Sequence, residues 1–433
     1  MKITVAGAGY VGLVTAVCLA EIGHSVICVD IQEERIKKLN EGYSPIFEPQ
    51  LEELMLKNKD RLQYTTEEEK AYKEADVIFI GVGTPEKKDG SANLKYVYSV
   101  AKDIAESIEK DTIIVIKSTV PIGTNGKIEK FIKNNLNRNV NIEVVSNPEF
   151  LAQGTAINDT LNAQRIVLGV ESESAKKTMK LVYDKFEQPY IFTDRNSAEM
   201  IKYASNDFLA LKISYINEIA NLCEIVGANI EDVAKGMGMD KRIGNKFLKA
   251  GIGYGGSCFP KDTKALHWLA EFNDYELKTV KATIEVNKNQ KIKLIKKARK
   301  YYENFEGVTI AILGSTFKPN TDDLRESPAI DNISILLDDG AKVKVYDPVG
   351  ENNLKKIFKD EICYCTSISE TLQDAEICLI FTEWDFIKKM DTSLFGKLMK
   401  MPIIIDGRNC FDFDKIPNGI IYESIGRKTI VNM

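Results

Sequence analysis

The sequence contains no uninterrupted apolar run near the roughly 20 residues that a helix needs to cross a bilayer. Its first residues form a short apolar strand and a glycine loop, without the charged segment, apolar core and cleavage site of a secretory signal. The 58 basic and 63 acidic residues give a net charge of −5, which is not the basic excess of a nucleic-acid binder. We therefore expect a protein that is not secreted and that binds neither membranes nor nucleic acid.

Histidine is scarce, and the cysteines form no metal-binding pattern. His24 lies in a predicted turn and His267 on a predicted helix beside Trp268, so neither is a convincing general base. The eight cysteines show neither the spacing of a disulfide framework nor that of a zinc site. This cysteine usage favours the reducing cytoplasm and predicts no bound metal.

The 433 residues, 44% hydrophobic and 28% charged, suffice for two or three globular domains. At the start of the chain, residues 2–6 read as a strand, 13–22 as a helix and 26–29 as a second strand that ends at Asp30. The loop between the first strand and the helix reads GAGYVG over residues 7–12. This context makes the glycine motif a strong signal of a dinucleotide-binding βαβ unit.

The residues of this unit predict which cofactor binds. Gly7, Gly9 and Gly12 permit a tight turn and a close approach of a pyrophosphate to the helix N-terminus. The Asp30 carboxylate would bind ribose hydroxyls and repel the 2′-phosphate of NADP, so NAD is expected. The loops at 81–85 and 118–121 follow later strands and are further candidate cofactor contacts.

The same plan recurs near the carboxyl end. Residues 308–313 and 342–346 read as strands around a helix at 329–337, and Gly340 to Asp347 repeats the spacing of Gly23 to Asp30. We therefore predict an α/β protein with two Rossmann-like, doubly wound domains joined by a central helical region with a long helix. The expected domains are 1–195, 196–299 and 300–433. The periodic apolar residues of the central region (Phe208, Leu211, Tyr215, Ile219 and Leu222) are interpreted as core.

One cysteine has the surroundings of a nucleophile. Cys258 follows a glycine-rich loop and stands at the start of a helix signalled by Pro260, next to Lys261. The helix dipole and the ammonium both favour a thiolate. Because oxidising an aldehyde by hydride transfer first requires a tetrahedral adduct, an NAD site and this thiol together point to an acid as the product. The apolar surroundings of Cys18, Cys28, Cys223 and Cys378 indicate packing instead.

Long motifs over essentially the whole chain resemble UDP-glucose 6-dehydrogenases, within the wider UDP-glucose/GDP-mannose dehydrogenase family. The motifs are GAGYVGL at 7–13, VGTP at 82–85, STVPIGT at 118–124, NPEFL at 147–151, RIGNKFLKAGIGYGGSCFPKD at 242–262 and FKPNTDDLRES at 317–327. The longest block is similar to the branch that acts on UDP-glucose rather than to relatives that act on N-acetylmannosamine nucleotides.

The resemblance implies roles for individual residues. Cys258 would be the nucleophile, Lys202 and Asn206 would stabilise oxyanions, Glu149 would assist acid/base steps, and Thr119 with Asp262 would position a water. Lys202 and Asn206 are spaced i, i+4, so they share one helix face. The expected cofactor contacts are Gly7, Gly9, Tyr10, Val11, Gly12, Asp30, Arg35, Gly83, Thr84, Pro85, Ser118, Thr119, Gln153, Lys261 and Arg325.

The nucleotide sugar would contact a second set of residues. These are Glu149, Phe150, Leu151, Lys202, Asn206, Arg242, Phe247, Leu248, Lys249, Tyr254, Gly255, Lys318 and Arg408. In relatives the position of Arg242 reaches a neighbouring subunit's site and the central helix forms the subunit contact, which implies a homodimer or larger homo-oligomer. The sequence departs from the family pattern at Gln153, where a carboxylate is common, so Gln153 is excluded from acid/base chemistry.

The expected activity is the four-electron oxidation of UDP-glucose to UDP-glucuronate, a polysaccharide precursor, through a cysteine thiohemiacetal and thioester with two NAD per turnover. Three alternatives stay open: a dehydrogenase of another nucleotide hexose, a two-electron β-hydroxyacid-type dehydrogenase, and a non-catalytic NAD-binding sensor. The yield of NADH per substrate separates the expected four-electron oxidation from the two-electron alternative.

Overall fold

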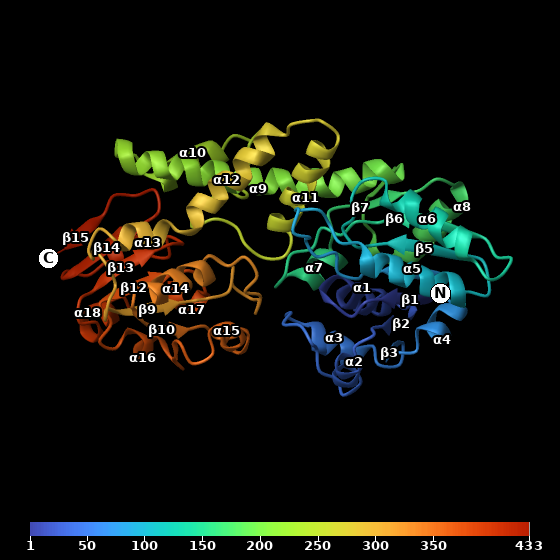
Figure 1. The fold of residues 1–433 in the computed structure, drawn as a ribbon, viewed down its shortest axis with the longest axis horizontal. Helices are drawn as coiled ribbons and strands as arrows, with labels where there is room; N and C mark the ends of the chain where they lie inside the picture. Colours follow the sequence, from blue (N-terminus) through green and yellow to red (C-terminus); the bar gives the residue numbers. More distant parts are fainter. Residues whose placement is uncertain (433) are drawn as a thin grey trace. The chain divides into compact units, whose positions relative to one another are not determined.

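The computed structural model describes residues 1–432 and divides into two compact units, Met1–Ser205 and Asn206–Met433. Figure 1 colours the chain from blue in the first unit to red in the second. Among the described residues, no helix is both long and apolar enough to cross a membrane.

The first unit is built on an eight-stranded sheet in the order β3-β2-β1-β4-β5-β6-β7-β8, in which β6 and β7 alone pair antiparallel. The strands are β1 Lys2–Ala6, β2 Ser25–Val29, β3 Leu62–Thr65, β4 Val77–Ile80, β5 Thr112–Ile116, β6 Ile142–Ser146, β7 Ile166–Gly169 and β8 Tyr190–Thr193. The helices are α1 Tyr10–Glu21, α2 Glu33–Asn40, α3 Leu51–Lys57, α4 Glu68–Lys73, α5 Lys95–Ser107, α6 Thr124–Asn135, α7 Ala156–Leu161 and α8 Glu173–Tyr183, followed by a 3-10 turn at Asp184–Phe186.

Helices cover both faces of this sheet, which explains its continuous apolar strands. In β4, Val77 and Phe79 pack into the core that contains α1, whereas Ile78 and Ile80 pack into the core that contains α5. All four residues are buried. The carboxyl ends of the strands are therefore the edge at which this unit can bind a ligand.

The second unit contains a seven-stranded sheet in the order β11-β10-β9-β12-β13-β14-β15, parallel except for β15. Its strands are β9 Thr309–Leu313, β10 Lys342–Tyr346, β11 Cys363–Tyr364, β12 Ile377–Ile380, β13 Ile403–Asp406, β14 Ile420–Ser424 and β15 Ile430–Asn432. Its helices are α10 Ile230–Gly238, α11 Phe259–Phe272, α12 Lys278–Lys291, α13 Lys293–Ala298, α14 Pro328–Asp338, α15 Glu351–Phe358, α16 Ile368–Leu372, α17 Asp385–Lys388 and α18 Ser393–Leu398, with a 3-10 turn at Phe413–Lys415.

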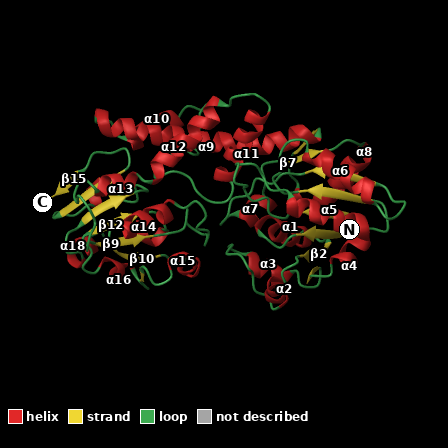
Figure 2. Cartoon of the chain, viewed as in Figure 1, coloured by secondary structure: helices red, strands yellow, loops and turns green. Residues whose placement is uncertain are grey.

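The predicted α/β architecture of two Rossmann-like sheets with a long central helix is confirmed; Figure 2 shows the strands of each sheet in yellow among red helices. The long helix is α9, Arg195–Val226. One boundary differs from the prediction, because α1 begins at Tyr10 and includes Gly12 instead of beginning at residue 13. Gly9 is the extended N-cap residue, so the helix starts inside the glycine motif.

The interpretation of the periodic apolar residues of α9 as core is wrong for three of them. Phe208, Tyr215 and Leu222 are exposed by 60%, 47% and 51%. Another face of the helix packs inward, where Ile216, Ala220 and Cys223 join the core of the second unit. The periodicity correctly identified an apolar helix, but part of the apolar surface of α9 is not covered by other residues of the same chain. Leu211 and Ile219 are partly buried.

Candidate functional site

The glycine loop after β1 has the geometry of a phosphate cradle. Gly7 adopts a φ of +100°, and a Cβ on Gly12 would lie 1.8 Å from the Gly7 oxygen, so both positions require glycine. A Cβ on Gly9 would meet nothing within 4 Å, which leaves open space at the N-terminus of α1. Among residues 1–432, no side chain caps this helix, so its first N–H groups remain available to an anion. The loop therefore fits the pyrophosphate of a dinucleotide.

Asp30 lies where β2 ends, and two donors hold its Oδ2 in place. Its Oδ2 accepts hydrogen bonds from the Ala8 N–H at 2.8 Å and from Arg35 Nη1 at 2.9 Å. The carboxylate is 8% exposed. The structure thus brings Asp30 and Arg35, both predicted from the sequence, to the same side of the glycine loop. A ribose hydroxyl at this position would donate to the Asp30 carboxylate, in addition to these bonds or in place of one of them.

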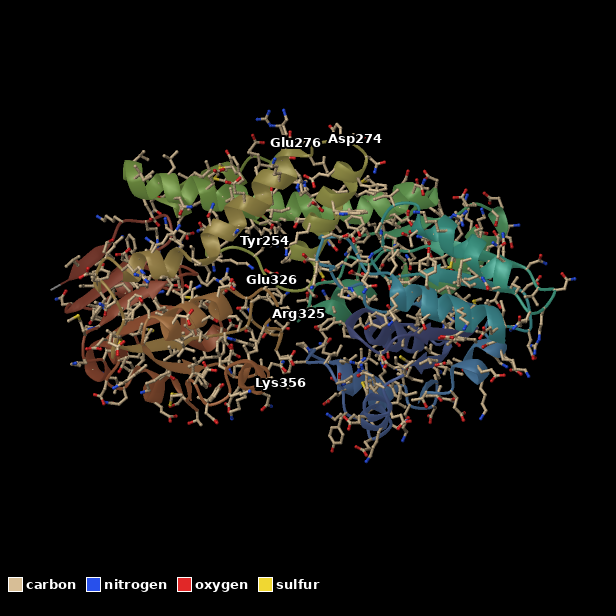
Figure 3. All side chains as sticks on the ribbon, viewed as in Figure 1. Tyr254, Asp274, Glu276, Arg325, Glu326 and Lys356 are labelled. Atoms are coloured by element: carbon tan, nitrogen blue, oxygen red, sulfur yellow. The ribbon has the colours of Figure 1, made fainter. Side chains whose placement is uncertain are left out.

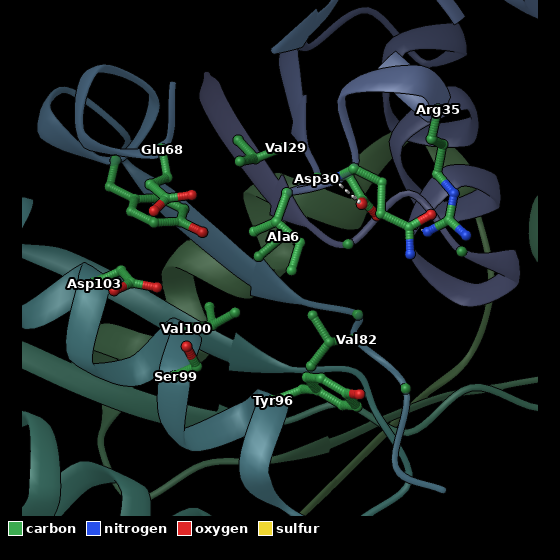
Figure 4. A pocket seen from close by; sticks show the side chains of 17 residues that line it. Ala6, Val29, Asp30, Arg35, Glu68, Val82, Tyr96, Ser99, Val100 and Asp103 are labelled. Atoms are coloured by element: carbon green, nitrogen blue, oxygen red, sulfur yellow. Dashed lines mark hydrogen bonds and ion pairs between the residues drawn. The ribbon is translucent and has the colours of Figure 1, made fainter. Parts of the chain in front are cut away.

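A cavity of about 340 Å³ opens between this loop and helices α4 and α5. Figure 4 shows Asp30 and Arg35 at one side and Glu68, Ser99 and Asp103 at the other. Burial raises the pKa of Glu68, with a further contribution from the charge of Asp103, and burial also raises the pKa of Asp103. Sequence reasoning missed this far wall, because α4 and α5 carry no local motif. The cavity suits the adenosine half of the cofactor.

The two loops predicted to follow β4 and β5 are joined by hydrogen bonds. Ser118 Oγ donates to the Val82 oxygen at 2.7 Å, and Thr84 Oγ1 donates to the Thr119 oxygen at 2.8 Å. A Cβ on Gly83 would meet nothing within 4 Å. These bonds bring residues 82–85 and 118–119 to the same edge of the sheet as the glycine loop.

Glu149 and Lys202 form a buried ion pair in the first unit. Lys202 Nζ donates to Glu149 Oε1 at 2.8 Å and to the Glu149 backbone oxygen at 2.6 Å, and the two side chains are 3% and 5% exposed. The Leu151 N–H donates to Glu149 Oε2 at 2.9 Å, and the Phe150 ring lies 5.4 Å from Lys202 Nζ. The structure therefore brings this part of the predicted constellation together.

Glu48 is a buried carboxylate that sequence reasoning missed. It accepts hydrogen bonds from the Gly154 N–H at 2.6 Å, from the Ala156 N–H at 2.7 Å and, at very short range, from the hydroxyl of Tyr10. It thereby ties the glycine loop to the segment that carries Gln153. In the sequence Glu48 is a carboxylate that follows two apolar residues in a loop. This pattern is too common to identify a functional residue.

In the second unit Cys258 is the N-cap residue of α11, as predicted, and Pro260 lies in the first turn. Asp262 is 1% exposed; it accepts hydrogen bonds from Asn206 Nδ2 at 2.6 Å and from Lys261 Nζ at 2.5 Å. The Asp262 N–H donates to the Cys258 oxygen at 2.8 Å. The first turn of α11 thus carries the thiol, a carboxylate and an ammonium, and Asn206 on α9 adds an amide bonded to the carboxylate.

The other cysteines differ from Cys258 as expected. Cys18, Cys28, Cys223 and Cys378 are buried, and all eight cysteines are free thiols. Burial raises the pKa of Cys18 to about 12 and raises that of Cys28 and Cys378 further. Cys18, Cys28 and Cys378 therefore stay protonated at neutral pH, and all four buried thiols serve packing.

A second carboxyl group lies close to Asp262. Burial, reinforced by the negative charge of Asp262, raises the pKa of Asp207 to about 8. Within the described part of the chain, neither oxygen of Asp207 has a hydrogen-bond partner. This group was not foreseen, because an aspartate next to Asn206 on a helix looks like an ordinary surface residue in the sequence.

The glycine-rich loop before Cys258 packs on the segment that follows β9. A Cβ on Gly255 would lie 2.5 Å from the Glu326 oxygen, and the Gly256 N–H donates to the Arg325 oxygen at 2.8 Å. Figure 3 labels Tyr254, Arg325 and Glu326 in this region. The Phe259 ring packs edge-to-face with Tyr254 and with Phe247, at centroid distances of 5.9 and 6.3 Å. Leu248 is buried and Lys249 is exposed.

Two arginines join the same region. Arg408 donates to the backbone oxygens of Gly253 and Phe317, at 3.3 and 3.2 Å, beside Lys318. Hydrogen bonding to Asp323 raises the pKa of Arg325, and a negative charge on Cys258 would add to this effect. By the same interaction, the guanidinium would favour a thiolate at Cys258. Arg242 lies apart from this cluster: its side chain is 88% exposed and bonds Asp240.

The sequence matches three domain models of one family. They are described as the NAD binding domain (residues 1–187), the central domain (196–289) and the UDP binding domain (311–413) of the UDP-glucose/GDP-mannose dehydrogenase family. The chain belongs to the UDP-glucose/GDP-mannose dehydrogenase family. As a member, it is an oxidoreductase whose cofactor is NAD, and its last domain is the family's UDP binding domain.

Relatives within this family match over the whole length. UDP-glucose 6-dehydrogenase YwqF from Bacillus subtilis is 49% identical over 434 residues, covering 100% of this chain and 99% of the relative. UDP-glucose 6-dehydrogenase from Rhizobium meliloti is 46% identical, covering 99% and 100%. The solved structure of a UDP-glucose dehydrogenase from Pyrobaculum islandicum matches with a TM-score of 0.92 and 35% identity, covering 97% of this chain and 96% of that one.

Proposed function

We propose that this protein oxidises the C6 alcohol of UDP-glucose to the carboxylate, giving UDP-glucuronate. The observation that carries the proposal is the position of Cys258 at the N-terminus of α11, with Asp262 and Asn206 hydrogen-bonded to each other beside it. A thiol in this position suits covalent capture of an aldehyde, which an alcohol dehydrogenase that stops at the aldehyde does not need. The full-length relatives named UDP-glucose 6-dehydrogenase support this substrate.

The chain's residues would act at successive stages. NAD, when bound, supplies the acceptor for the hydride in each of two oxidations. Lys202 and Asn206 share one face of α9 and would stabilise the oxygen that becomes negatively charged at C6. Cys258 would attack the aldehyde carbon, the second hydride would leave the adduct, and water held by Asp262 and Thr119 would release the acid from the thioester. Glu149 would accept and return protons through its contact with Lys202.

Two surfaces would hold the ligands. The glycine loop, Asp30, Arg35, the 82–85 and 118–119 loops, Gln153, Lys261 and Arg325 would contact NAD. The nucleotide sugar would lie against residues 247–255, with Lys318 and Arg408 near its uridine or phosphates. We place the protein in the cytoplasm, in agreement with its eight free cysteines.

A substrate panel tests this proposal. The purified chain is incubated with NAD and, in turn, UDP-glucose, UDP-N-acetylmannosamine and GDP-mannose, and the products are identified by mass spectrometry. The second nucleotide is included because the solved structure of a UDP-D-ManNAc dehydrogenase from Pyrococcus horikoshii matches at 28% identity with a TM-score of 0.87. We expect UDP-glucuronate from the first substrate; a faster conversion of either other nucleotide to its acid overturns the assignment.

We also propose that two copies of the chain pair through α9. Phe208, Tyr215 and Leu222 are exposed and spaced seven residues apart, the repeat with which one helix packs against an equivalent one. In this dimer the exposed Arg242 would reach the partner's substrate site. The stripe of exposed apolar residues lies along a single 32-residue helix, so the same helix of a second copy is the partner that this spacing favours.

Leu222→Glu is expected to convert the dimer to a monomer and to lower kcat/KM for UDP-glucose at least 10-fold, because a buried unpaired carboxylate weakens the interface and Arg242 loses its target. Light scattering after gel filtration measures the mass. Leu56→Glu is the matched control, since Leu56 is an exposed leucine (69%) on α3. A fully active monomeric unsubstituted protein contradicts both the interface and the role of Arg242.

A further inference from the structure

Lys117 is a buried lysine to which the proposed reaction gives no role. It follows β5, and it is only 9% exposed. Its Nζ donates a hydrogen bond to Asn147 Oδ1 at 3.0 Å and lies 5.9 Å from the centre of the Tyr183 ring. Burial lowers its pKa to about 8. Burying a lysine costs folding stability unless its charge is paired or hydrogen-bonded. The groups around Lys117 therefore indicate what its charge does.

Asn147 is held at every polar atom of its side chain. Its Oδ1 also accepts the Tyr183 hydroxyl at 2.5 Å, its Nδ2 donates to the Val167 oxygen at 2.8 Å, and its backbone N–H donates to the Ile116 oxygen at 2.9 Å. Asn147 is the first residue of the NPEFL segment, two positions before Glu149. Lys117 therefore fixes the segment that carries Glu149.

The charge of Lys117 also acts on the ion pair beyond this segment. The titratable groups that face it are Glu149, Lys202 on α9, Cys18 on α1 and Tyr183 on α8. Burial raises the pKa of Cys18 to about 12 and keeps Tyr183 neutral, so these two carry no charge near pH 7. Of the charged neighbours, Glu149 stabilises the Lys117 ammonium and Lys202 destabilises it. Because pairwise electrostatic interactions are mutual, the Lys117 cation also acts on the charges of the Glu149–Lys202 pair.

We propose that Lys117 is a positioning residue for the Glu149–Lys202 pair: it orients the 147–151 segment through Asn147, and its charge sets the pH range in which the pair works. This role rests on the proposed function, in which Glu149 and Lys202 act on the substrate.

The test measures kcat, KM and their pH dependence in Lys117→Met and Lys117→Gln. Removal of a nearby positive charge raises the pKa of groups that titrate beside it, so both limbs of the kcat profile should move to higher pH, by about one unit. Displacement of the segment should lower kcat on the order of 10²-fold. KM for NAD should stay within about twofold, because the glycine loop is untouched.

Three further variants separate charge from packing. Lys117→Arg keeps the charge and should retain the unsubstituted pH profile. Tyr183→Phe removes a hydrogen bond to Asn147 without changing charge, so it should lower kcat and leave both limbs in place. Lys297→Met is the matched control, because Lys297 is also buried (4% exposed) but pairs with Glu224 and Glu423 in the second unit. It should reduce stability and leave the pH profile unchanged.

The proposal is overturned if Lys117→Met and Lys117→Gln keep the unsubstituted profile, or if Lys297→Met moves the limbs equally. If the unsubstituted protein does not oxidise UDP-glucose, the proposed function fails instead. Lysine titration followed by NMR then decides the charge role: one resonance with a midpoint near pH 8 that disappears in Lys117→Arg supports it, and no such resonance refutes it. The same titration decides the question if neither neutral variant folds.

Discussion

Cys258→Ser is expected to lower the rate of acid formation by on the order of 10³-fold or more, the largest effect of any single substitution in the site. A serine hydroxyl has a much higher pKa than a thiol and is rarely ionised at neutral pH, so the α11 N-terminus and Arg325 have no anion to stabilise. Any ester that does form hydrolyses more slowly than a thioester. Binding of NAD should be retained, because the substitution leaves the glycine loop, Asp30 and the other proposed cofactor contacts unchanged.

The measurement is the rate of UDP-glucuronate production, together with mass spectrometry of the protein after incubation with UDP-glucose and NAD. Cys18→Ser and Cys378→Ser are the controls, since both thiols are buried in apolar cores. They should lower stability without a selective block in chemistry. Production of UDP-glucuronate by Cys258→Ser at the unsubstituted rate would make Cys258 incidental and favour a β-hydroxyacid-type reaction.

Lys202→Ala is expected to have the second largest effect, because it damages both the chemistry and the fold. The developing oxyanion loses a donor, which typically costs 10²–10³-fold in kcat. The Glu149 carboxylate, 5% exposed, is left without its cation, and breaking such a buried pair costs about 3–5 kcal/mol of unfolding free energy. Denaturant unfolding and steady-state kinetics measure the two losses separately.

The double variant Lys202→Ala/Glu149→Gln separates the two causes. Replacing the orphaned carboxylate by a neutral amide should restore much of the lost stability, whereas kcat should stay as low as in the single variant or fall further. Recovery of activity together with stability would show that Lys202 supports the fold and takes no part in the reaction.

The sequence predicted those parts of the site that depend on local chemistry. The dinucleotide loop was predictable because the 7–12 motif lies between a strand and a helix and Asp30 ends the next strand. Cys258 was predictable because glycines and Pro260 specify a helix start at one thiol. In both cases a few neighbouring residues determine the backbone conformation, and the chemistry follows from it.

The remaining parts depend on contacts between distant segments, which no local pattern encodes. Glu48 bonds Gly154 and Ala156 across more than 100 residues of chain, and Lys117 reaches Asn147 across 30. The exposed stripe of α9 was misassigned to the core for the same reason: periodicity shows that a face is apolar but not what covers it. The family resemblance assigned Glu149 and Lys202 to the same reaction, and the structure adds the hydrogen bond between their side chains.

The most direct test of the whole account is the number of NADH molecules formed when a limiting amount of UDP-glucose is consumed to completion. Conversion of an alcohol to an acid removes four electrons and each NAD accepts two, so the cysteine mechanism predicts two NADH per UDP-glucose with UDP-glucuronate as the sole sugar product. A ratio of one, with free UDP-linked aldehyde in solution, would contradict the role of Cys258 and with it the central claim.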